Sequence, residues 1–387
     1  MRKNASIRVG LVAMVAAMAA LVAPAAGAAT RQSGPDGRVD AAARAGGLPP
    51  RWETSSAGRL PDTGYLGSVS APDRDHAWAV GHRNDRMGTP HGVIMRWDGE
   101  DWRPDDTPGL PEVRYWHTVS AVSPHEVWAY GWGDTGDSEI VVRFDGKRWR
   151  PVALPELPGG GIYGFAELSA APGRTWLAGD GRISAYDRGG WHRTELARGV
   201  TVADVDARSA RDAWAVGGFA LVGQRSRPVA LHWNGRRWQE VRLPFDSMRL
   251  SKVYAESAHS VWVSGYALGQ EDYPPKVLHW NGKRWRDVTG PVKDISPQAL
   301  SGDGRGRIWL SGDPAGWEGP AVYWRYDGRR WTRVQGPTVP GGRTQSYQIT
   351  DLAPIGRTGR TWAVGAYELL GDEHTSYGHE LIQRSTR

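Results

Sequence analysis

The sequence predicts an all-β fold, a seven-bladed β-propeller with four antiparallel strands in each blade. Three observations support this prediction. A Trp followed three residues later by Gly recurs at intervals of 50, 48, 38, 48, 47 and 53 residues. A second motif follows most copies: an aromatic residue, Asp-Gly or Asn-Gly, two further residues and another Trp. The runs around both motifs alternate with period two, as in β-strands, and repeats of this length built from short strands are typical of propellers.

The first motif starts strand B of each repeat, where A to D denote the four strands of a blade in chain order. Its copies are Trp78 to Gly81, Trp128 to Gly131, Trp176 to Gly179, Trp214 to Gly217, Trp262 to Gly265, Trp309 to Gly312 and Trp362 to Gly365. The second motif joins strands C and D through a hairpin, because Asp-Gly and Asn-Gly favour tight hairpin turns. Its copies begin at Asp98, Asp145, Asn234, Asn281 and Asp327, with a looser copy at Asp187. In the third repeat the short interval of 38 residues is explained by a two-residue hairpin at Asp180-Gly181.

The two ends of the repeat region predict how the ring closes. The last repeat has strands A and B and a strand C at Glu380–Gln383, but no closing Trp follows. Trp52 precedes Trp78 by 26 residues, the distance that also separates Trp102 from Trp128. We therefore expect the N-terminal strand to complete the last blade, which removes the exposed strand edge of an open ring. Residues 52–387 then supply 48 residues per blade.

The sequence predicts three segments. Residues 1–29 have the features of a secretory signal peptide: Arg2, Lys3 and Arg8, an apolar run from Val9 to Val22, and small residues up to Ala29. Residues 30–51 are rich in Gly and Pro and are expected to form a flexible leader. Residues 52–387 form the propeller. We therefore expect a secreted, extracellular protein without a membrane span after signal removal.

Composition narrows the possible partners. The chain has no Cys, so no disulfide supports the fold. Loss of residues 1–29 lowers the formal charge from +6 to +3. A basic residue precedes the strand C aromatic in most repeats, as at Arg96, Arg143, His232, His279 and Arg325. This regular placement favours cation–π contacts within the scaffold over nucleic-acid binding. We expect a monomer that binds no nucleic acid.

Aromatic residues outside the repeated positions are the candidate binding site. Of the 21 Trp residues, seventeen occupy repeated positions in strands B, C and D and are expected to pack between blades. Of the other four, Trp324 shares a face with Tyr326 in strand C and is expected in the core. The remaining three, together with Tyr and His residues, fall in the D-to-A and B-to-C connections, which meet at one end of a propeller. The predicted ligand-binding residues are Trp116, Trp132, Trp317, Tyr65, Tyr115, His117, Tyr163, Tyr266 and Tyr347. Aromatic surfaces mixed with acids and amides suit a glycan or another cell-surface polymer, or a protein partner.

The sequence identifies no catalytic residues and no complete metal site. Asp134, Asp137 and Glu139 could hold calcium, but the set is incomplete, and His374 and His379 alone do not make a metal site. No cofactor is expected. Acidic residues in the same loops leave open a glycan-active hydrolase or lyase, which needs two carboxylates at a fixed separation. A protein-interaction scaffold is a further alternative.

The repeat unit resembles kelch and tectonin repeats and is similar to the Asp-box of sialidases, as found in Trp-rich propellers of secreted bacterial proteins. The resemblance covers residues 52–387. It implies a propeller fold and, for tectonins, lectin-like binding without catalysis. For sialidases the resemblance implies an arginine triad, a Tyr nucleophile and an acidic partner. The stretch Arg59-Leu60-Pro61 is similar to the first arginine motif of that family. Only Gly217-Gly218 preserves the kelch double glycine. The copper chemistry of kelch-type galactose oxidases needs a Cys that this chain lacks.

Overall fold

The computed structural model describes residues 50–61, 63–85, 87–133, 139–154, 166–179, 181–220, 226–269, 273–303, 305–314, 319–339, 344–369 and 378–386. The expected signal peptide and nearly all of the expected leader lie outside these residues. The described residues form 28 strands and no helix, so none of them forms an apolar helix that could cross a membrane. The prediction of an all-β protein is confirmed.

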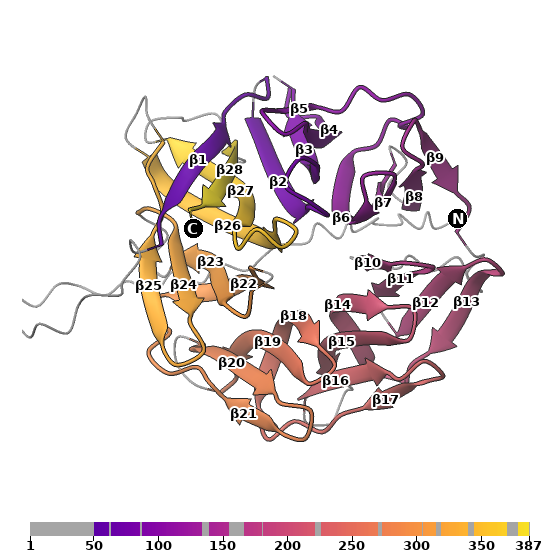
Figure 1. Cartoon of the computed structure of the whole chain (residues 1–387), viewed down its shortest axis with the longest axis vertical. Coiled ribbons are helices and arrows are strands. Elements are labelled where there is room, and N and C mark those ends of the chain that lie inside the picture. Colours follow the sequence, from indigo (N-terminus) through magenta and orange to yellow (C-terminus); the bar gives the residue numbers. More distant parts are fainter. Residues whose placement is uncertain are drawn as a thin grey trace, which may run out of the picture. The chain divides into compact units, whose positions relative to one another are not determined.

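The strands form seven four-stranded antiparallel sheets, arranged in a ring around a centre near which the first strand of each sheet lies (Figure 1). Blades 1 to 3 consist of β2 (Thr63–Ser70), β3 (Ala77–Asn84), β4 (Pro90–Trp97) and β5 (Trp102–Pro104); β6 (Tyr115–Ser123), β7 (Glu126–Trp132), β8 (Glu139–Phe144) and β9 (Trp149–Val152); and β10 (Glu167–Ala171), β11 (Arg174–Gly179), β12 (Arg182–Asp187) and β13 (Gly190–Glu195). Blades 4 and 5 consist of β14 (Val200–Ser209), β15 (Asp212–Phe219), β16 (Arg227–Trp233) and β17 (Trp238–Glu240); and β18 (Met248–Ser257), β19 (Ser260–Ala267), β20 (Pro275–Trp280) and β21 (Trp285–Asp287).

Blade 6 consists of β22 (Ile295–Gly302), β23 (Ile308–Pro314), β24 (Val322–Tyr326) and β25 (Trp331–Gln335). Blade 7 combines both ends of the propeller. Its order is β26 (Thr344–Pro354), β27 (Thr361–Leu369), β28 (His379–Ser385) and β1 (Trp52–Ala57). β1 pairs antiparallel with β28, with Trp52 opposite Ser385. The predicted closure by the N-terminal strand is therefore confirmed. The two-residue connection predicted for blade 3 is also confirmed, because β11 ends at Gly179 and β12 begins at Arg182.

Trp residues fill the space between neighbouring blades. The strand B Trp of one blade contacts the aromatic residues of strands C and D in the next. Trp362 of blade 7 lies 5.1 Å, centroid to centroid, from both Trp97 and Trp102 of blade 1. Trp52 stacks on Tyr323 of blade 6 at 3.9 Å and contacts the edge of Trp309 at 5.1 Å. Such offset and edge contacts add to the stabilisation from apolar burial, and they confirm the packing role expected for the repeated Trp positions.

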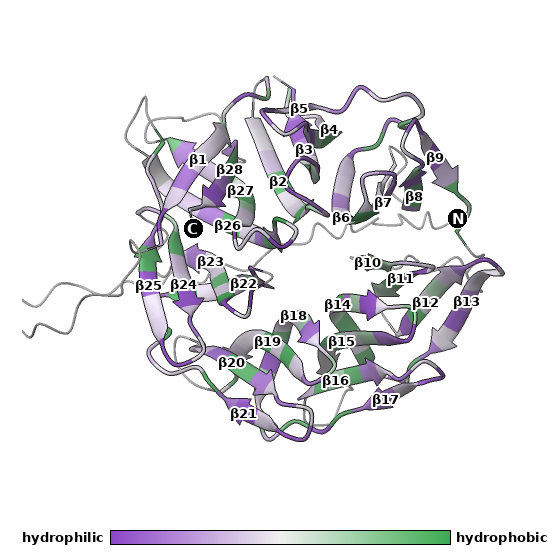
Figure 2. Cartoon of the chain, viewed as in Figure 1, coloured by the Kyte–Doolittle hydropathy of each residue, from purple (hydrophilic) through white to green (hydrophobic). Residues whose placement is uncertain are grey.

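The basic residue before the strand C aromatic lies over the strand B Trp, as the sequence predicted. The guanidinium of Arg96 is 5.6 Å from the ring of Trp78, and that of Arg143 is 5.4 Å from the ring of Trp128. In blades 4 and 5 the imidazole rings of His232 and His279 stack on the Trp instead. Hydrophobic residues are prominent on second strands such as β11 and β15, whereas outer strands such as β13 and β21 are more hydrophilic (Figure 2).

In six of the seven blades, the Gly of the Trp-x-x-Gly motif accommodates a β-bulge in the innermost strand. A Cβ added to Gly81 would lie 1.9 Å from the carbonyl oxygen of Tyr65, and one added to Gly265 would lie 1.8 Å from that of Arg249. The innermost strand bulges at this point, between Leu66 and Ser68 in blade 1. Only glycine allows so close an approach of two backbones. The motif therefore fixes the register of the inner strand.

We predict that Trp52→Ala lowers the stability of the whole ring by about 3 kcal/mol or more, because it removes a buried ring at the point of closure. Thermal unfolding measures the effect. Glu53→Ala is the matched control: Glu53 is the next residue of β1, is exposed, and makes a surface ion pair with Arg384. The control should cost at most about 1 kcal/mol. Equal melting temperatures for the two variants would contradict a closure that depends on Trp52.

Candidate functional site

Charged side chains lie near the centre of the ring, at one equivalent position of the innermost strands. In each innermost strand, this position lies two residues before the residue that pairs with the strand B Trp. In the six innermost strands that have a bulge, it is the first residue after the bulge. The seven residues are Ser68, Thr118, Glu167, Asp204, Lys252, Ala299 and Asp351. The inner strands of neighbouring blades contact one another around the ring. Four of the seven positions carry ionisable side chains, Glu167, Asp204, Lys252 and Asp351, and the central region that they share is here called the channel. Ala299 instead is fully buried in the core between blades 6 and 7.

Lys252 of blade 5 and Glu167 of blade 3 interact across the channel. The Lys252 Nζ lies 3.7 Å from the Glu167 Oε1, and the two side chains are 20% and 18% exposed. The Nε2 of His117 is 3.6 Å from the same carboxylate oxygen. Although burial opposes ionisation of Glu167, Lys252 and His117 lower its pKa to about 2. Burial likewise disfavours the Lys252 cation, but Glu167, Asp204 and Asp351 hold the pKa of Lys252 above its usual value.

One lysine does not stabilise all the carboxylates around it equally. Burial raises the pKa of Asp204 to about 8, and the negative charge of Glu167 acts in the same direction. Burial also raises the pKa of Asp351. Both carboxylates accept backbone hydrogen bonds from the next blade: Asp204 from Val253 N at 2.7 Å, and Asp351 from Val69 N at 2.9 Å. At neutral pH the channel therefore holds an ionised Lys252–Glu167 pair beside a largely protonated Asp204.

A cavity of about 240 Å³ lies beside this channel, between blades 7 and 1. Its lining residues come from the starts of β2 and β26, the ends of β3 and β27, and the segment before β28. They are Tyr65, His82, Ser346, Gln348, Ala366, Tyr367, Glu368 and Gly378. This is the end of the ring at which the sequence predicted a binding site.

Tyr65 links the cavity to the charged channel. It lines the cavity, and burial together with Asp313 and other channel carboxylates raises the pKa of its hydroxyl to about 12. Its ring centroid lies 5.6 Å from that of His82, which in turn lies 4.8 Å from Tyr115. Burial lowers the pKa of His82 to about 4, so its imidazole is neutral at physiological pH. The hydroxyl of Ser346 donates to the carboxylate of Glu368 at 3.2 Å. The cavity therefore combines aromatic surfaces with hydroxyl, amide and carboxylate groups.

The structure brings some of the sequence-predicted residues together and separates others. Tyr65, Tyr115 and His117 lie around the channel mouth. Trp116 is only 3% exposed and belongs to the core between blades 1 and 2. Tyr347 is 1% exposed, and its hydroxyl accepts a hydrogen bond from Val339 N. Neither ring is available as a surface for a ligand in this structure.

The remaining predicted residues lie away from the cavity or outside the described residues. Trp132 is half-buried, and its Nε1 donates to the Tyr130 hydroxyl at 3.0 Å. Tyr266 is half-buried beside Tyr273, with ring centroids 5.7 Å apart, and Tyr273 is 60% exposed. Trp317 and Tyr163 lie outside the described residues.

The candidate metal ligands are not brought together. Asp134, Asp137 and His374 lie outside the described residues. Glu139 accepts a hydrogen bond from the Tyr130 hydroxyl at 3.1 Å, and His379 lies beside the ring of Tyr367 at 5.3 Å. The described residues contain no group of three or more His, Asp or Glu side chains that could hold a metal ion.

Sequence reasoning missed the charged channel residues Glu167, Asp204, Lys252 and Asp351. Counting back from the strand B Trp places Asp204 and Lys252 ten residues before it, but Glu167 nine and Asp351 eleven. The strand pairing, and not the spacing in the sequence, shows that the four residues occupy one equivalent position of strand A. The partial signal in the sequence was the pair Asp204 and Lys252, which stand at the same distance from the Trp in consecutive repeats.

Comparisons with known structures show the same fold. YCF48 from Cyanidioschyzon merolae has 18% identity and a TM-score of 0.55, with 86% of this chain and 98% of that chain covered. A GH74 xyloglucanase from Xanthomonas campestris has 16% identity and a TM-score of 0.55, with 83% of this chain and 53% of that chain covered. The β-propeller domain of the Trilobed protease from Pyrococcus furiosus has 11% identity and a TM-score of 0.53, with 83% and 95% covered. No family model and no curated protein matches the sequence.

We predict that Lys252→Met destabilises the protein by about 3 kcal/mol or more, because it leaves Glu167 charged and largely buried without its cation. The double variant Lys252→Met/Glu167→Gln should recover much of this loss, since it removes both charges. Urea unfolding at neutral pH measures the three free energies. If the double variant were as unstable as the single one, the pair would contribute no specific interaction.

Proposed function

We propose that this chain is a non-catalytic binding propeller that recognises a glycan in the cavity between blades 7 and 1. The observation that carries the proposal is the lining of that cavity. Tyr65 supplies a half-buried aromatic ring and the largely buried Tyr367 forms part of the wall, while Gln348, Glu368 and Ser346 supply hydrogen-bonding groups. Sugars present apolar ring faces that stack on aromatic side chains and hydroxyls that bind amides and carboxylates. Binding sites typically combine apolar walls with a few placed polar groups in this way.

The size and position of the cavity favour one sugar unit of a longer chain. A cavity of about 240 Å³ lies at the small end for ligand sites. It opens beside the charged channel, where Tyr65 is common to both. A neighbouring sugar unit could therefore place a hydroxyl or amino group near Glu167 and Asp204. We propose that the protein acts outside the cell as a monomer, following the signal peptide that the sequence predicts.

The second candidate is a glycan-active hydrolase, and the fold comparison with a protein named as a xyloglucanase is compatible with it. The cavity favours binding instead. Glu368 is the one carboxylate among the described residues that line it, whereas glycoside hydrolysis ordinarily uses a pair of carboxylates flanking the scissile bond. A protein-interaction scaffold is a third candidate, and the small size of the cavity favours it less than a glycan.

The test is a glycan array with the purified chain, followed by calorimetry on the best ligand. We predict that Gln348→Ala and Glu368→Gln each weaken binding about tenfold or more, which is about 1.4 kcal/mol. Both residues are half-buried at the cavity, so their loss removes hydrogen bonds to the ligand without removing core packing.

Tyr273→Ala is the matched control, because Tyr273 is the exposed aromatic residue of blade 5 at the same end of the ring. It should leave the affinity unchanged. Loss of binding in Tyr273→Ala with unchanged cavity variants would place the ligand elsewhere. Turnover of labelled glycosides by the unmodified chain would replace the binding function with the hydrolytic one.

A further inference from the structure

The hairpins that join strands C and D carry pairs of basic residues at two exposed positions whose residue type the turn does not determine. The pairs are Lys147-Arg148 in blade 2, Arg236-Arg237 in blade 4, Lys283-Arg284 in blade 5 and Arg329-Arg330 in blade 6. In each hairpin the side chain of the turn Asp or Asn accepts hydrogen bonds from the backbone N–H groups of both basic residues. The backbone is thereby fixed, and all eight basic residues are exposed.

The scaffold does not require these charges. Blade 1 makes the same two hydrogen bonds from Asp98, but its residues at these positions are Glu100 and Asp101. A turn of this geometry therefore accepts acidic residues equally well. The geometry of the turn therefore does not explain why these residues are basic. Exposed charges of one sign on one face are typical of a surface that binds a partner of opposite charge.

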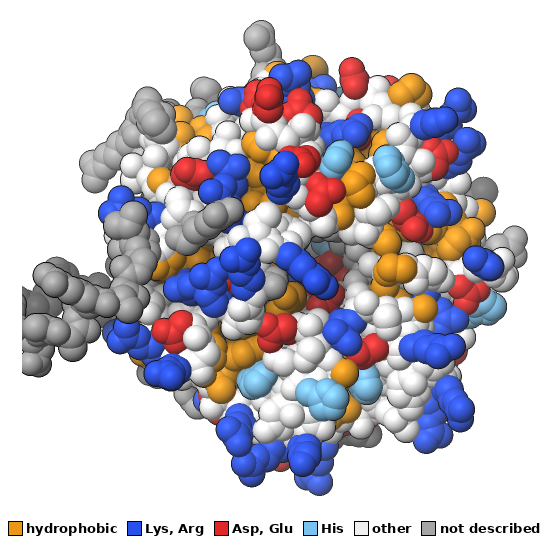
Figure 3. Space-filling view, viewed as in Figure 1, with side chains coloured by type: hydrophobic (Ala, Val, Ile, Leu, Met, Phe, Trp, Pro, Cys, Tyr) orange, Lys and Arg blue, Asp and Glu red, His pale blue; other side chains and the backbone are white. Residues whose placement is uncertain are grey.

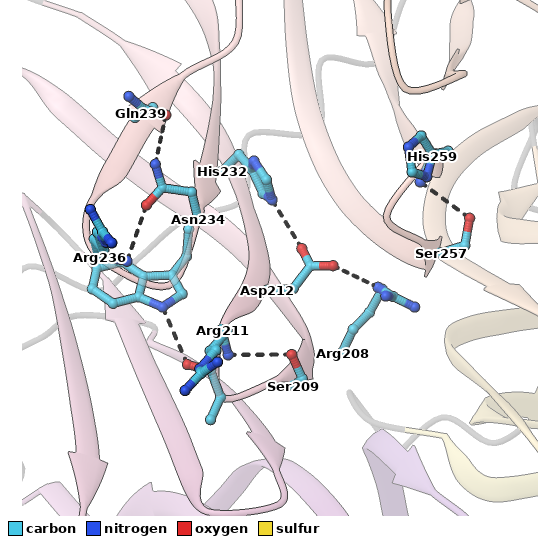
Figure 4. Close-up of polar contacts among 12 residues, drawn as sticks. Arg208, Ser209, Arg211, Asp212, His232, Asn234, Arg236, Gln239, Ser257 and His259 are labelled. Carbon is cyan, nitrogen blue, oxygen red and sulfur yellow. Dashed lines mark hydrogen bonds and ion pairs between the residues drawn. The ribbon is translucent and has the colours of Figure 1, made fainter.

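The turns that join strands A and B lie at the same end and add further positive charge. A Cβ added to Gly235 would lie 3.2 Å from the side chain of Arg211, and one added to Gly282 would lie 2.6 Å from the ring of His259. The two kinds of turn are thus close together in blades 4 and 5. Figure 4 shows Arg211 and Arg236 on blade 4 and His259 on the neighbouring blade 5.

Most of these cations have no acidic partner. Within the described part of the chain, no carboxylate lies within ion-pair distance of Arg211, Arg236, Lys283, Arg284 or Arg329. By contrast, the guanidinium of Arg208, which lies near the end of β14, forms an ion pair with Asp212 at 2.9 Å (Figure 4). Lys and Arg side chains are also prominent around the margin of the ring in the space-filling view (Figure 3). The surface formed by these turns in blades 4 to 6 is here called the basic face.

The exposed hydrophobic side chains, or their absence, indicate what kind of partner the basic face would bind. The large hydrophobic side chains that are exposed among the described residues are Met87 and Tyr273. Both lie in B-to-C connections, at the opposite end of the ring. The described part of the basic face thus offers no exposed aromatic ring on which a nucleic-acid base could stack. The turns of adjacent blades lie at one end of the ring. Positive charges arranged in this way match an extended layer of negative charge better than one strand of nucleic acid.

We propose that the basic face docks on an anionic lipid surface, with the cavity at the opposite end of the ring directed away from the membrane. Lys and Arg residues near an anionic bilayer are each attracted to it, and the attraction weakens as salt screens the charges. Docking through turns at one end would leave the ligand site accessible. The protein would then present its ligand-binding end outward from a membrane without spanning it.

The experiment is co-sedimentation of the full chain with phosphatidylcholine vesicles, with and without phosphatidylglycerol. The unmodified protein should bind the anionic vesicles at low salt, release at high salt, and ignore the neutral ones. The test variant Arg236→Ser/Arg237→Ser/Lys283→Ser/Arg284→Ser should bind about 100-fold more weakly. Replacing Arg236, Arg237 and Arg284 with Lys should keep the binding, since the charge remains.

The control removes four charges from the opposite end: Arg198→Ser/Arg242→Ser/Arg249→Ser/Lys293→Ser, all at exposed positions in or beside D-to-A connections. It should bind vesicles like the unmodified protein. Equal weakening in both quadruple variants would show a net-charge effect and overturn the proposal. So would binding to duplex DNA without binding to anionic vesicles. Melting temperatures check that each variant is folded, and glycan affinity should be the same in all of them.

Discussion

The close approach of two backbones at the strand B glycine is the constraint from which the rest of the structure follows. In six of the seven blades, a Cβ on this glycine would lie 1.8 to 2.3 Å from a carbonyl oxygen of the innermost strand. The innermost strand can approach this closely only because glycine has no side chain, and it bulges where it does so. The bulge interrupts the alternation of inward and outward side chains. The next residue then contacts the innermost strand of the neighbouring blade, as Ser68 and Asp204 do by accepting hydrogen bonds from Val119 N and Val253 N.

The architecture could be predicted because the same constraint recurs seven times. The missing closing Trp of the last repeat and the distance of 26 residues from Trp52 to Trp78 predict that Trp52 belongs to the last blade, and the structure pairs it with Ser385. The aromatic site was less predictable because strands extend into stretches expected to be loops. β6 begins at Tyr115, so Trp116 points into the core between blades. Tyr347 lies within β26 for the same reason. Three of the four channel charges, Asp204, Lys252 and Asp351, follow a bulge, which breaks the period-two pattern on which strand analysis relies.

The two ends of the ring differ in chemistry although they share one scaffold. At one end, inner-strand residues and the ends of strands B make a small, partly open cavity with aromatic and polar walls. At the other end, short turns hold exposed basic pairs in a fixed backbone. The repeated Trp residues pack between neighbouring blades, and they contribute neither to the cavity nor to the basic face. This division explains why a chain with 21 Trp residues has so few aromatic rings exposed in its described part.

Titration of the channel carboxylates tests most directly whether the seven inner strands bring their charges into one site. Carbon-13 NMR of the side-chain carboxyl groups can follow Glu167 and Asp204 separately, with Asp204→Asn and Glu167→Gln for assignment. The account predicts that Glu167 stays ionised down to about pH 2 and that Asp204 keeps its proton up to about pH 8. If both groups titrated near pH 4, as carboxyls in water do, the charges would be solvated separately and the proposed channel site would not exist.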